Sequence, residues 1–272
     1  MRYHKPACSN QTTGRPVFFI QPHGEFLSNT QWIIFASILL INTAAAVAIA
    51  ALLTRRSPAP GLRSLIWMLV MLAIWNFGYA MITLSPSLEA KSLWLRIENI
   101  GILTVPVFWF FFAVQYNRLG GWLNRFTGVL FFLVPLLSLS LLFSEQWFDL
   151  YYASISPISE AGGPLVIERG SWYVVALVYS YLLNLIAIAL LVWRAVQHRN
   201  IYRMQMYVLI AAVLIPILVN VFYQVMLSTR PDPSYRIDLT PIAFTLSAVL
   251  IAIGVFGLRI FDLIPIARHT VL

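Results

Sequence analysis

Seven separate apolar segments, each about 20 residues long, constrain what this chain can fold into. The segments are Trp32–Leu53, Leu65–Leu84, Trp94–Tyr116, Phe126–Phe143, Trp172–Trp193, Met204–Leu227 and Pro241–Leu258. A helix of that length matches the hydrocarbon thickness of a bilayer. Strands are excluded because the segments lack the alternation of a membrane barrel. Lipid also offers no partner for an unpaired backbone amide. The sequence therefore predicts an all-α integral membrane protein, a seven-transmembrane-helix bundle.

Composition agrees with the bilayer as the main partner. Hydrophobic residues make up 60% of the chain and charged residues 10%, whereas a soluble domain is about one quarter charged. The net charge of +8 comes from arginines at the ends of the apolar segments, not in one run or on one face. That distribution is typical of a membrane protein and gives no support for nucleic-acid binding.

The arginines between the segments predict an N-terminus outside the cytoplasm and a C-terminus inside it, as in a multi-pass protein of the bacterial inner membrane. With this orientation, each of three short cytoplasmic loops carries two or three arginines near a helix end. These are Arg55, Arg56, Arg63, Arg118, Arg125, Arg194, Arg199 and Arg203. The long loop Ser144–Ser171 holds four acidic residues and one arginine, which fits the outer side.

The chain reads as one domain without internal repeats, so the inverted repeats of many transporters are not seen. We expect residues 1–31 to form an extracytoplasmic tail and residues 32–258 the transmembrane domain. Residues 259–272 are expected to form a cytoplasmic linker.

Residues that catalyse reactions inside a membrane bundle are missing from the predicted helices. Both lysines, Lys5 and Lys91, lie outside those helices, so none can hold retinal as a Schiff base. The histidines lie in tails or loops, where they cannot bind haem or a metal within the bundle. The chain also has no HExxH, no GxSxG and no phosphate-binding loop. We therefore expect no enzyme activity, no cofactor and no metal site.

Polar side chains are instead concentrated in the halves of the helices that face outward. The candidate ligand-binding residues are Asn76, Tyr79, Glu98, Asn184, Asn220, Tyr223, Gln224 and Asp238. The inner halves of the fifth and seventh helices, Leu185–Val192 and Ala248–Leu258, are apolar or carry only small residues. Polar groups in membrane helices tend to face the bundle interior and mark functional sites. The pattern predicts an outward-opening cavity in the outer third of the membrane. Alternatively, each polar pair only holds helices together, at about 0.6–2 kcal/mol.

Two charged residues and three prolines within the predicted helices lead to further predictions. Arg96 and Glu98 are two positions apart and point to different faces, so each needs a partner elsewhere, with Asp238 and Arg236 the nearest candidates. Prolines are also expected to kink three helices, because proline removes a backbone hydrogen bond. These are Pro106, Pro135 and Pro216.

The most specific residues stand near the C-terminus. Asp238-Leu239-Thr240-Pro241 puts proline at a first helical position, with Thr240 as the expected N-cap, and the chain closes with Arg259-Ile-Phe-Asp-Leu-Ile-Pro-Ile-Ala-Arg268. Further matching positions are Trp94, Glu98, Pro106 and Tyr116 in the third segment and Pro216 and Asn220 in the sixth. Together they resemble the seven-transmembrane N-terminal sensor region of bacterial histidine kinases, from Trp32 to Arg268.

The resemblance implies a sensor or receptor that binds a small extracytoplasmic ligand. In that family a cytoplasmic PAS domain follows, and then a histidine kinase or a diguanylate cyclase. Residues 259–272 would then lead toward such an output domain, supplied in cis or in trans. The chain could be the sensor half of a longer protein or a stand-alone relative, and the sequence leaves both open.

Two other functions fit a helical membrane protein, namely a small-solute transporter or carrier and an assembly subunit without a ligand. A transporter needs a polar route to the cytoplasm, which the apolar inner halves of the fifth and seventh helices do not offer. In an assembly subunit the outer polar residues would only hold helices together. The identity of the ligand and the formation of a homodimer stay open.

Overall fold

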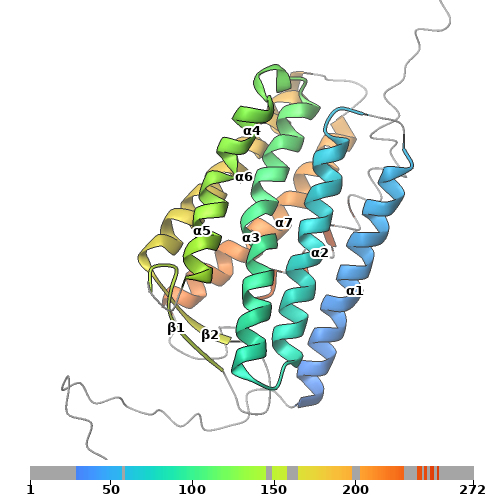
Figure 1. Cartoon of the computed structure of the whole chain (residues 1–272). Coiled ribbons are helices and arrows are strands. Elements are labelled where there is room, and N and C mark those ends of the chain that lie inside the picture. The colour runs from blue at the N-terminus through green and yellow to red at the C-terminus, as the bar shows by residue number, and fades with distance from the viewer. Residues whose placement is uncertain are drawn as a thin grey trace, which may run out of the picture.

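Long helices make up most of this computed structural model, which describes residues 29–56, 59–144, 149–157, 165–197, 203–229, 238–240, 242–243, 246–247 and 250. The five long helices are α1 (Asn29–Thr54), α2 (Leu62–Leu84), α3 (Leu88–Tyr116), α6 (Ser171–Gln197) and α7 (Arg203–Thr229). They lie side by side as a bundle (Figure 1). Each is long and apolar enough to cross a membrane. They confirm as helices the first, second, third, fifth and sixth predicted segments.

The seventh predicted segment is described only at its start, where Thr240, Ile242 and Ala243 are helical, and at a few positions up to residue 250. The expected N-terminal tail up to residue 28 lies outside the described residues, and so does the expected linker, residues 259–272.

The fourth predicted segment is not one helix. It forms α4 (Arg125–Phe131) and α5 (Leu133–Phe143), separated by a turn at Phe132. The physical reason is Pro135, which has no N–H to donate to the carbonyl of Phe131 four positions earlier. That carbonyl accepts a hydrogen bond from the hydroxyl of Tyr179 in α6 instead, at 2.6 Å. The break thus fastens the α4–α5 pair to α6.

The long loop after α5 contains a β-hairpin that the sequence did not predict. Strands β1 (Tyr152–Pro157) and β2 (Leu165–Arg169) pair antiparallel. Figure 1 shows the hairpin at the end of the bundle where α2 ends and α3 begins. Gly170 then approaches the hairpin's other end so closely that a Cβ atom would lie 2.1 Å from the carbonyl oxygen of Leu150. Only glycine allows this contact, which holds the hairpin against the start of α6.

Two glycines let α2 and α3 pack with their backbones nearly touching. A Cβ atom on Gly78 would lie 2.8 Å from Cβ of Glu98, and one on Gly101 would lie 2.4 Å from the carbonyl oxygen of Met71. Small residues at a helix crossing allow such close approach in membranes. The crossing places Glu98 of α3 directly beside α2.

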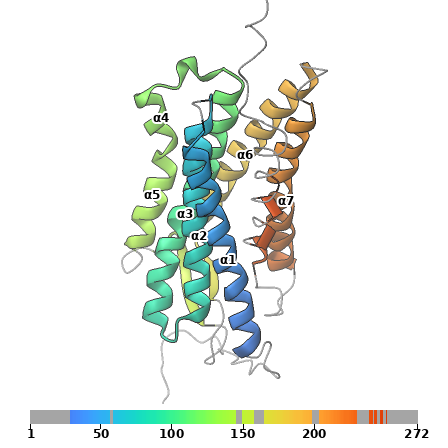
Figure 2. The same cartoon turned by 90° about the vertical axis from the view of Figure 1, so that its right-hand side faces the viewer.

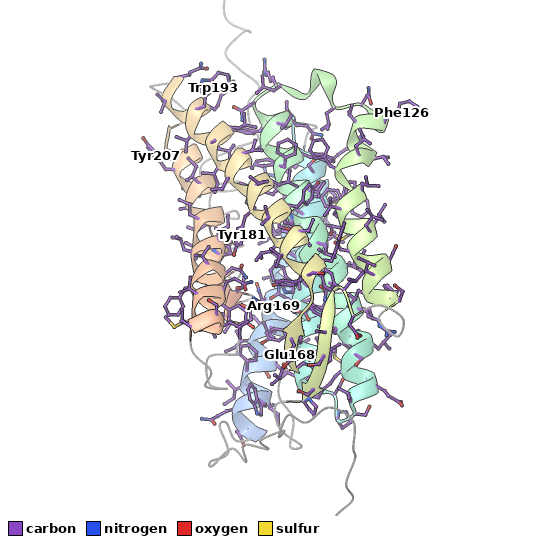
Figure 3. The ribbon with its side chains drawn as sticks, turned by 90° about the vertical axis from the view of Figure 1, so that its left-hand side faces the viewer. Phe126, Glu168, Arg169, Tyr181, Trp193 and Tyr207 are labelled. Atoms are coloured by element: carbon purple, nitrogen blue, oxygen red, sulfur yellow. The ribbon has the colours of Figure 1, made fainter. Side chains whose placement is uncertain are left out.

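An apolar core fills the bundle at the end away from the hairpin. Its buried side chains come from α1, α2, α3, α6 and α7, and include Leu53, Leu65, Leu69, Trp109, Phe112, Leu191 and Ala212. Figure 2 shows α4 and α5 on one side of α1–α3 and α7 on the other. Figure 3 places Phe126, Trp193 and Tyr207 at this same end and Glu168 at the opposite one. All three aromatic side chains are exposed, as expected of residues at a membrane interface.

Candidate ligand-binding site

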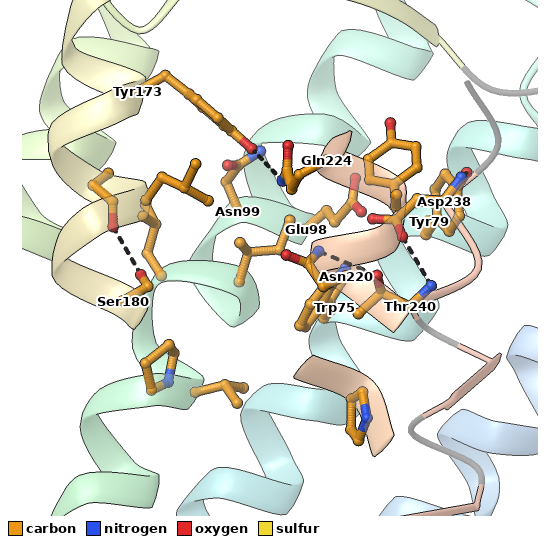
Figure 4. Close-up of a pocket in the computed structure, with 18 of the residues that line it drawn as sticks. Trp75, Tyr79, Glu98, Asn99, Tyr173, Ser180, Asn220, Gln224, Asp238 and Thr240 are labelled. Carbon is orange, nitrogen blue, oxygen red and sulfur yellow. Dashed lines mark hydrogen bonds between the residues drawn. The ribbon is translucent and has the colours of Figure 1, made fainter. Parts of the chain in front are cut away.

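A cavity of about 230 Å³ opens between α2, α3, α6, α7 and the β-hairpin (Figure 4). Seven of the eight predicted residues line it, namely Tyr79, Glu98, Asn184, Asn220, Tyr223, Gln224 and Asp238. They come from four helices and from the segment that follows α7. The structure therefore brings these distant side chains together, and their binding of a ligand stays a prediction.

Asn76 does not line the cavity. Its side chain is fully buried against α1, where its amide oxygen accepts a hydrogen bond from Nδ2 of Asn42 at 2.7 Å. Its own Nδ2 donates to the carbonyl of Leu72 in the same helix at 2.8 Å. Asn76 therefore fits the alternative reading, in which a polar pair holds two helices together. The helical face that it shares with Tyr79 is wide enough to meet both α1 and the cavity.

The cavity extends along the bundle from the hairpin to the apolar core, and its position in the outer third of a membrane stays a prediction. Met68, Trp109 and Ala212 line its far part, next to the apolar core described above. The helical prolines Pro106 and Pro216 also line its wall. The part near the hairpin thus combines polar side chains with apolar ones such as Leu95 and Leu165, whereas the part near the opposite end is lined mainly by apolar groups.

The hairpin contributes two tyrosines that sequence reasoning missed. The hydroxyls of Tyr151 and Tyr152 both donate to Oδ1 of Asn99, at 3.2 and 3.1 Å, and all three residues line the cavity. Burial raises the pKa of both tyrosines above the ordinary value, so the hydroxyls remain protonated donors. Two features of the sequence could have indicated this contact. One is the pair of tyrosines in a loop predicted to lie outside the cytoplasm, and the other is Asn99, which directly follows the candidate residue Glu98.

Arg169, the last residue of β2, also lines the cavity and was not among the predicted site residues. Its guanidinium donates to Oε1 of Gln224 in α7 and lies 4.5 Å from the ring centroid of Tyr173. A cation over an aromatic face at this distance is attracted by the negative charge of the ring face. Arg169 is the one arginine of the long loop, which was the signal in the sequence.

A chain of hydrogen bonds links α6, α7 and the start of the last helix, and Figure 4 shows the bond in it between Asn220 and Thr240. Tyr181 in α6 donates to Oδ1 of Asn220 in α7 at 2.5 Å, and Nδ2 of Asn220 donates to the hydroxyl of Thr240 at 3.1 Å. The expected capping role of Thr240 is taken by Asp238, whose Oδ1 accepts the backbone N–H of Thr240 at 2.8 Å. The reason is that Thr240 already lies within the helix, and the backbone N–H groups of Ile242 and Ala243 donate to the carbonyl of Leu239.

Two carboxylates, Glu98 and Asp238, line the same part of the cavity (Figure 4) and interact electrostatically. Glu98 is 6% exposed and accepts a hydrogen bond from the side chain of Trp75. The backbone N–H of Asp238 donates to the hydroxyl of Tyr79 at 3.3 Å. Burial raises the pKa of Asp238, whereas the hydrogen bonds from Thr240 and the charge of Arg169 act in the opposite direction.

Arg96 does not reach Asp238, which the sequence offered as a partner. Its guanidinium lies 5.7 Å from the ring centroid of Phe143 in α5. The two-residue offset from Glu98 explains this, since the two side chains leave α3 in different directions. Glu98 faces the cavity and Arg96 faces α5. The other candidate partner, Arg236, lies outside the described residues.

Most of the chain matches a known family of membrane regions. The family model described as the N-terminal 7TM region of histidine kinase matches residues 34–265. This range contains every residue of the cavity and most of the chain. A search of the curated proteins finds no match to this chain.

Proposed function

Because the chain belongs to the family of N-terminal 7TM regions of histidine kinases, we propose that its cavity is the ligand-binding site of the sensor. The family identifies a membrane sensor region that is not itself catalytic. In this proposal residues 32–258 bind a small extracytoplasmic ligand. Residues 259–272 pass the resulting change to a cytoplasmic PAS, kinase or cyclase domain.

The observation that carries the proposal is the unequal lining of the cavity. Tyrosines, amides and carboxylates from four helices and a hairpin converge at one end, and an apolar core packs the other end. Residues that only hold helices together have no reason to surround a void. The same core argues against a small-solute transporter, which needs a polar path through the whole membrane.

The proposed orientation places the hairpin and the polar end of the cavity outside the cytoplasm of a bacterial cell. The arginine-rich loops between α1 and α2, α3 and α4, and α6 and α7 support it, since short cytoplasmic loops are rich in basic residues. A ligand would then reach the cavity from the side of the hairpin, and residues 1–31 would form an outer tail.

The contacts of the cavity suggest how binding reaches the cytoplasmic side. Asn220 of α7 is bonded to Thr240 at the start of the last helix, and Pro216 lies one helical turn from Asn220 along the cavity wall. Proline loosens the backbone of α7 there. A ligand that moves the outer part of α7 would therefore move the last helix, whose continuation leads to the linker.

A cavity-filling substitution tests this function. In a chimera that joins this chain to a histidine kinase core, we expect Ser180→Trp to change autophosphorylation in membrane vesicles several-fold, because Ser180 lines the cavity. The matched control is Ser140→Trp, since Ser140 lies exposed on α5. Equal output from both variants and the parent would contradict the proposal. Transport of solute across the vesicle membrane, abolished by Ser180→Trp, would favour the carrier.

A further inference from the structure

The ionisable side chains of the cavity give it an excess of negative charge when all of them are ionised. Among the lining residues that the structure describes, Glu98 and Asp238 are acidic and Arg169 is the basic one. The charge of Arg169 acts on Asp238, whereas the described charge that acts on Glu98 is the like charge of Asp238. A ligand with one positive charge would balance the set.

The amide groups at the polar end are largely occupied by one another. Gln224 accepts from Arg169 and donates to the Tyr173 hydroxyl at 3.2 Å. Asn220 is bonded on both sides, to Tyr181 and Thr240. Glu98 has its hydrogen bond from Trp75, but two carboxylate oxygens can accept about four. The carboxylates therefore keep the largest capacity to accept hydrogen bonds from a ligand.

Aromatic rings surround the two carboxylates. Trp75, Tyr79 and Tyr223 line this part of the cavity, and both tyrosines lie close enough to Glu98 and Asp238 to interact electrostatically. Aromatic faces attract organic cations, most strongly where water is excluded. The Arg169 guanidinium over Tyr173 shows that one ring of this cavity already holds a cation.

A metal ion fits this lining less well than an organic cation. Within the described ranges, no group of three His, Cys, Asp or Glu side chains comes together, whereas Ca²⁺ takes about six to eight oxygen ligands. The rings would offer a hydrated metal ion little, but they match the alkyl part of an amine.

We propose that the ligand is a small protonated amine, whose N–H groups donate to Glu98 and Asp238 and whose charge lies against the rings of Tyr79 and Tyr223. This inference rests on the proposed function, because it assigns a ligand class to the same site. The cavity volume of about 230 Å³ suits a compact amine.

Binding of n-butylammonium to the purified full chain in phosphatidylcholine nanodiscs tests the inference. We expect saturable binding by calorimetry and a higher unfolding temperature, because a ligand that binds the folded state stabilises it. Butanol and butyrate, which have the same chain but no positive charge, are expected to bind at least tenfold more weakly. Equal binding of butanol, or no binding of butylammonium, would overturn the inference.

Glu98→Gln removes one acceptor charge and should weaken butylammonium binding at least tenfold. The matched control is Glu89→Gln, since Glu89 is exposed on the same helix outside the cavity, and its affinity should match the parent. If Glu98→Gln does not fold, Asp238→Asn gives the same test from a different element. If a folded Glu98→Gln or Asp238→Asn variant binds butylammonium as tightly as the parent, the proposed role of the carboxylates is wrong. The same conclusion follows if tetramethylammonium, which has no N–H, binds as tightly as butylammonium.

The two proposals fail in different ways. If butylammonium binds but leaves autophosphorylation of the kinase chimera unchanged, the sensor function is contradicted and the ligand class stands. If Ser180→Trp changes the output but no amine binds, the ligand class is contradicted and the sensor function stands.

Discussion

The guanidinium of Arg169 donates to the side-chain oxygen of Gln224, and this contact joins the β-hairpin to α7 across the cavity. Gln224 in turn donates to the hydroxyl of Tyr173, whose ring lies under the same guanidinium. The three side chains therefore form a closed set that spans β2, α6 and α7. The position of the hairpin depends on α7, and the position of α7 depends on the hairpin.

Arg169→Met should loosen the hairpin because it removes both the hydrogen bond and the contact of the cation with the ring. We expect backbone amides of β1 and β2 to exchange hydrogen several-fold faster, measured by mass spectrometry. The neighbouring Glu168 is exposed, so Glu168→Gln should leave exchange unchanged. Equal protection in Arg169→Met would show that the strand pairing alone holds the hairpin in place.

The buried contact between Asn42 and Asn76 should behave as a coupled pair. Leucine at either position leaves the other amide without its partner, whereas the double variant removes both polar groups. In a double-mutant cycle on the free energy of unfolding in mixed micelles, we expect a coupling of about 0.6–1.7 kcal/mol. Strictly additive effects would mean that the two amides do not hold α1 against α2.

Gly101→Ala should destabilise the protein by about 1–3 kcal/mol, because the added methyl group meets backbone atoms that cannot move aside. The new Cβ atom would lie 2.4 Å from the carbonyl oxygen of Met71. Gly128 in α4 has nothing within 4 Å of that position, so Gly128→Ala should be neutral or stabilise by up to about 1 kcal/mol. Both variants are compared by unfolding in sodium dodecyl sulfate, and a similar loss in both would contradict the close crossing.

Amine binding should weaken at acidic pH because Asp238 must be ionised to accept from an ammonium group. Burial raises the pKa of Asp238, so its charge is lost at a pH above the ordinary value of about 3.9. The free protein should respond with the opposite sign. A raised pKa in the folded state adds stability at low pH, and that contribution is lost as the pH rises through the raised pKa.

Titration of butylammonium affinity and unfolding temperature between pH 7 and pH 4 measures both trends, with Asp238→Asn as the control for the contribution of this group. An affinity of the parent that does not change over this range would contradict the role of Asp238. The described groups that interact with Asp238 are Thr240, Arg169, Glu98, Tyr79, Tyr173, Tyr181 and Tyr223.

Cysteine labelling tests the orientation of the bundle. In a Cys8→Ser background, we expect Ser156→Cys in the hairpin to react with an impermeant maleimide in intact cells. Gly121→Cys, between α3 and α4, should react only after permeabilisation. Both positions are exposed, so access to the reagent decides the result, and the reverse pattern would put the N-terminus in the cytoplasm.

Local sequence sufficed for the long helices, because length and apolarity alone require them in a bilayer. It also predicted a kink at Pro135 where the structure has a break between α4 and α5, but not the Tyr179 hydroxyl that satisfies the freed carbonyl. That partner lies 48 positions away from Phe131 in the sequence. Contacts of this kind depend on which helices become neighbours, which periodicity does not specify.

Because periodicity does not specify which helices become neighbours, seven of the eight predicted residues line the cavity and Asn76 does not. The spacing of Asn220, Tyr223 and Gln224 correctly placed them on one face of a helix, and that face meets the void. Asn76 has an equally polar face but meets Asn42. A row of polar residues on one face indicates that the helix has a polar neighbour. It does not indicate whether that neighbour is a bound ligand or a polar side chain of another helix, such as Asn42.

A signal transmitted through a membrane needs a part that stays still as well as a part that moves. The crossing at Gly78 and Gly101 suits the first role, because α2 and α3 pack there with their backbones close together. Glu98 belongs to this closely packed pair, whereas Asp238 leads into the last helix. In the proposed function, a ligand held between the two carboxylates would push against the closely packed α2–α3 pair, and the displacement would pass to the last helix.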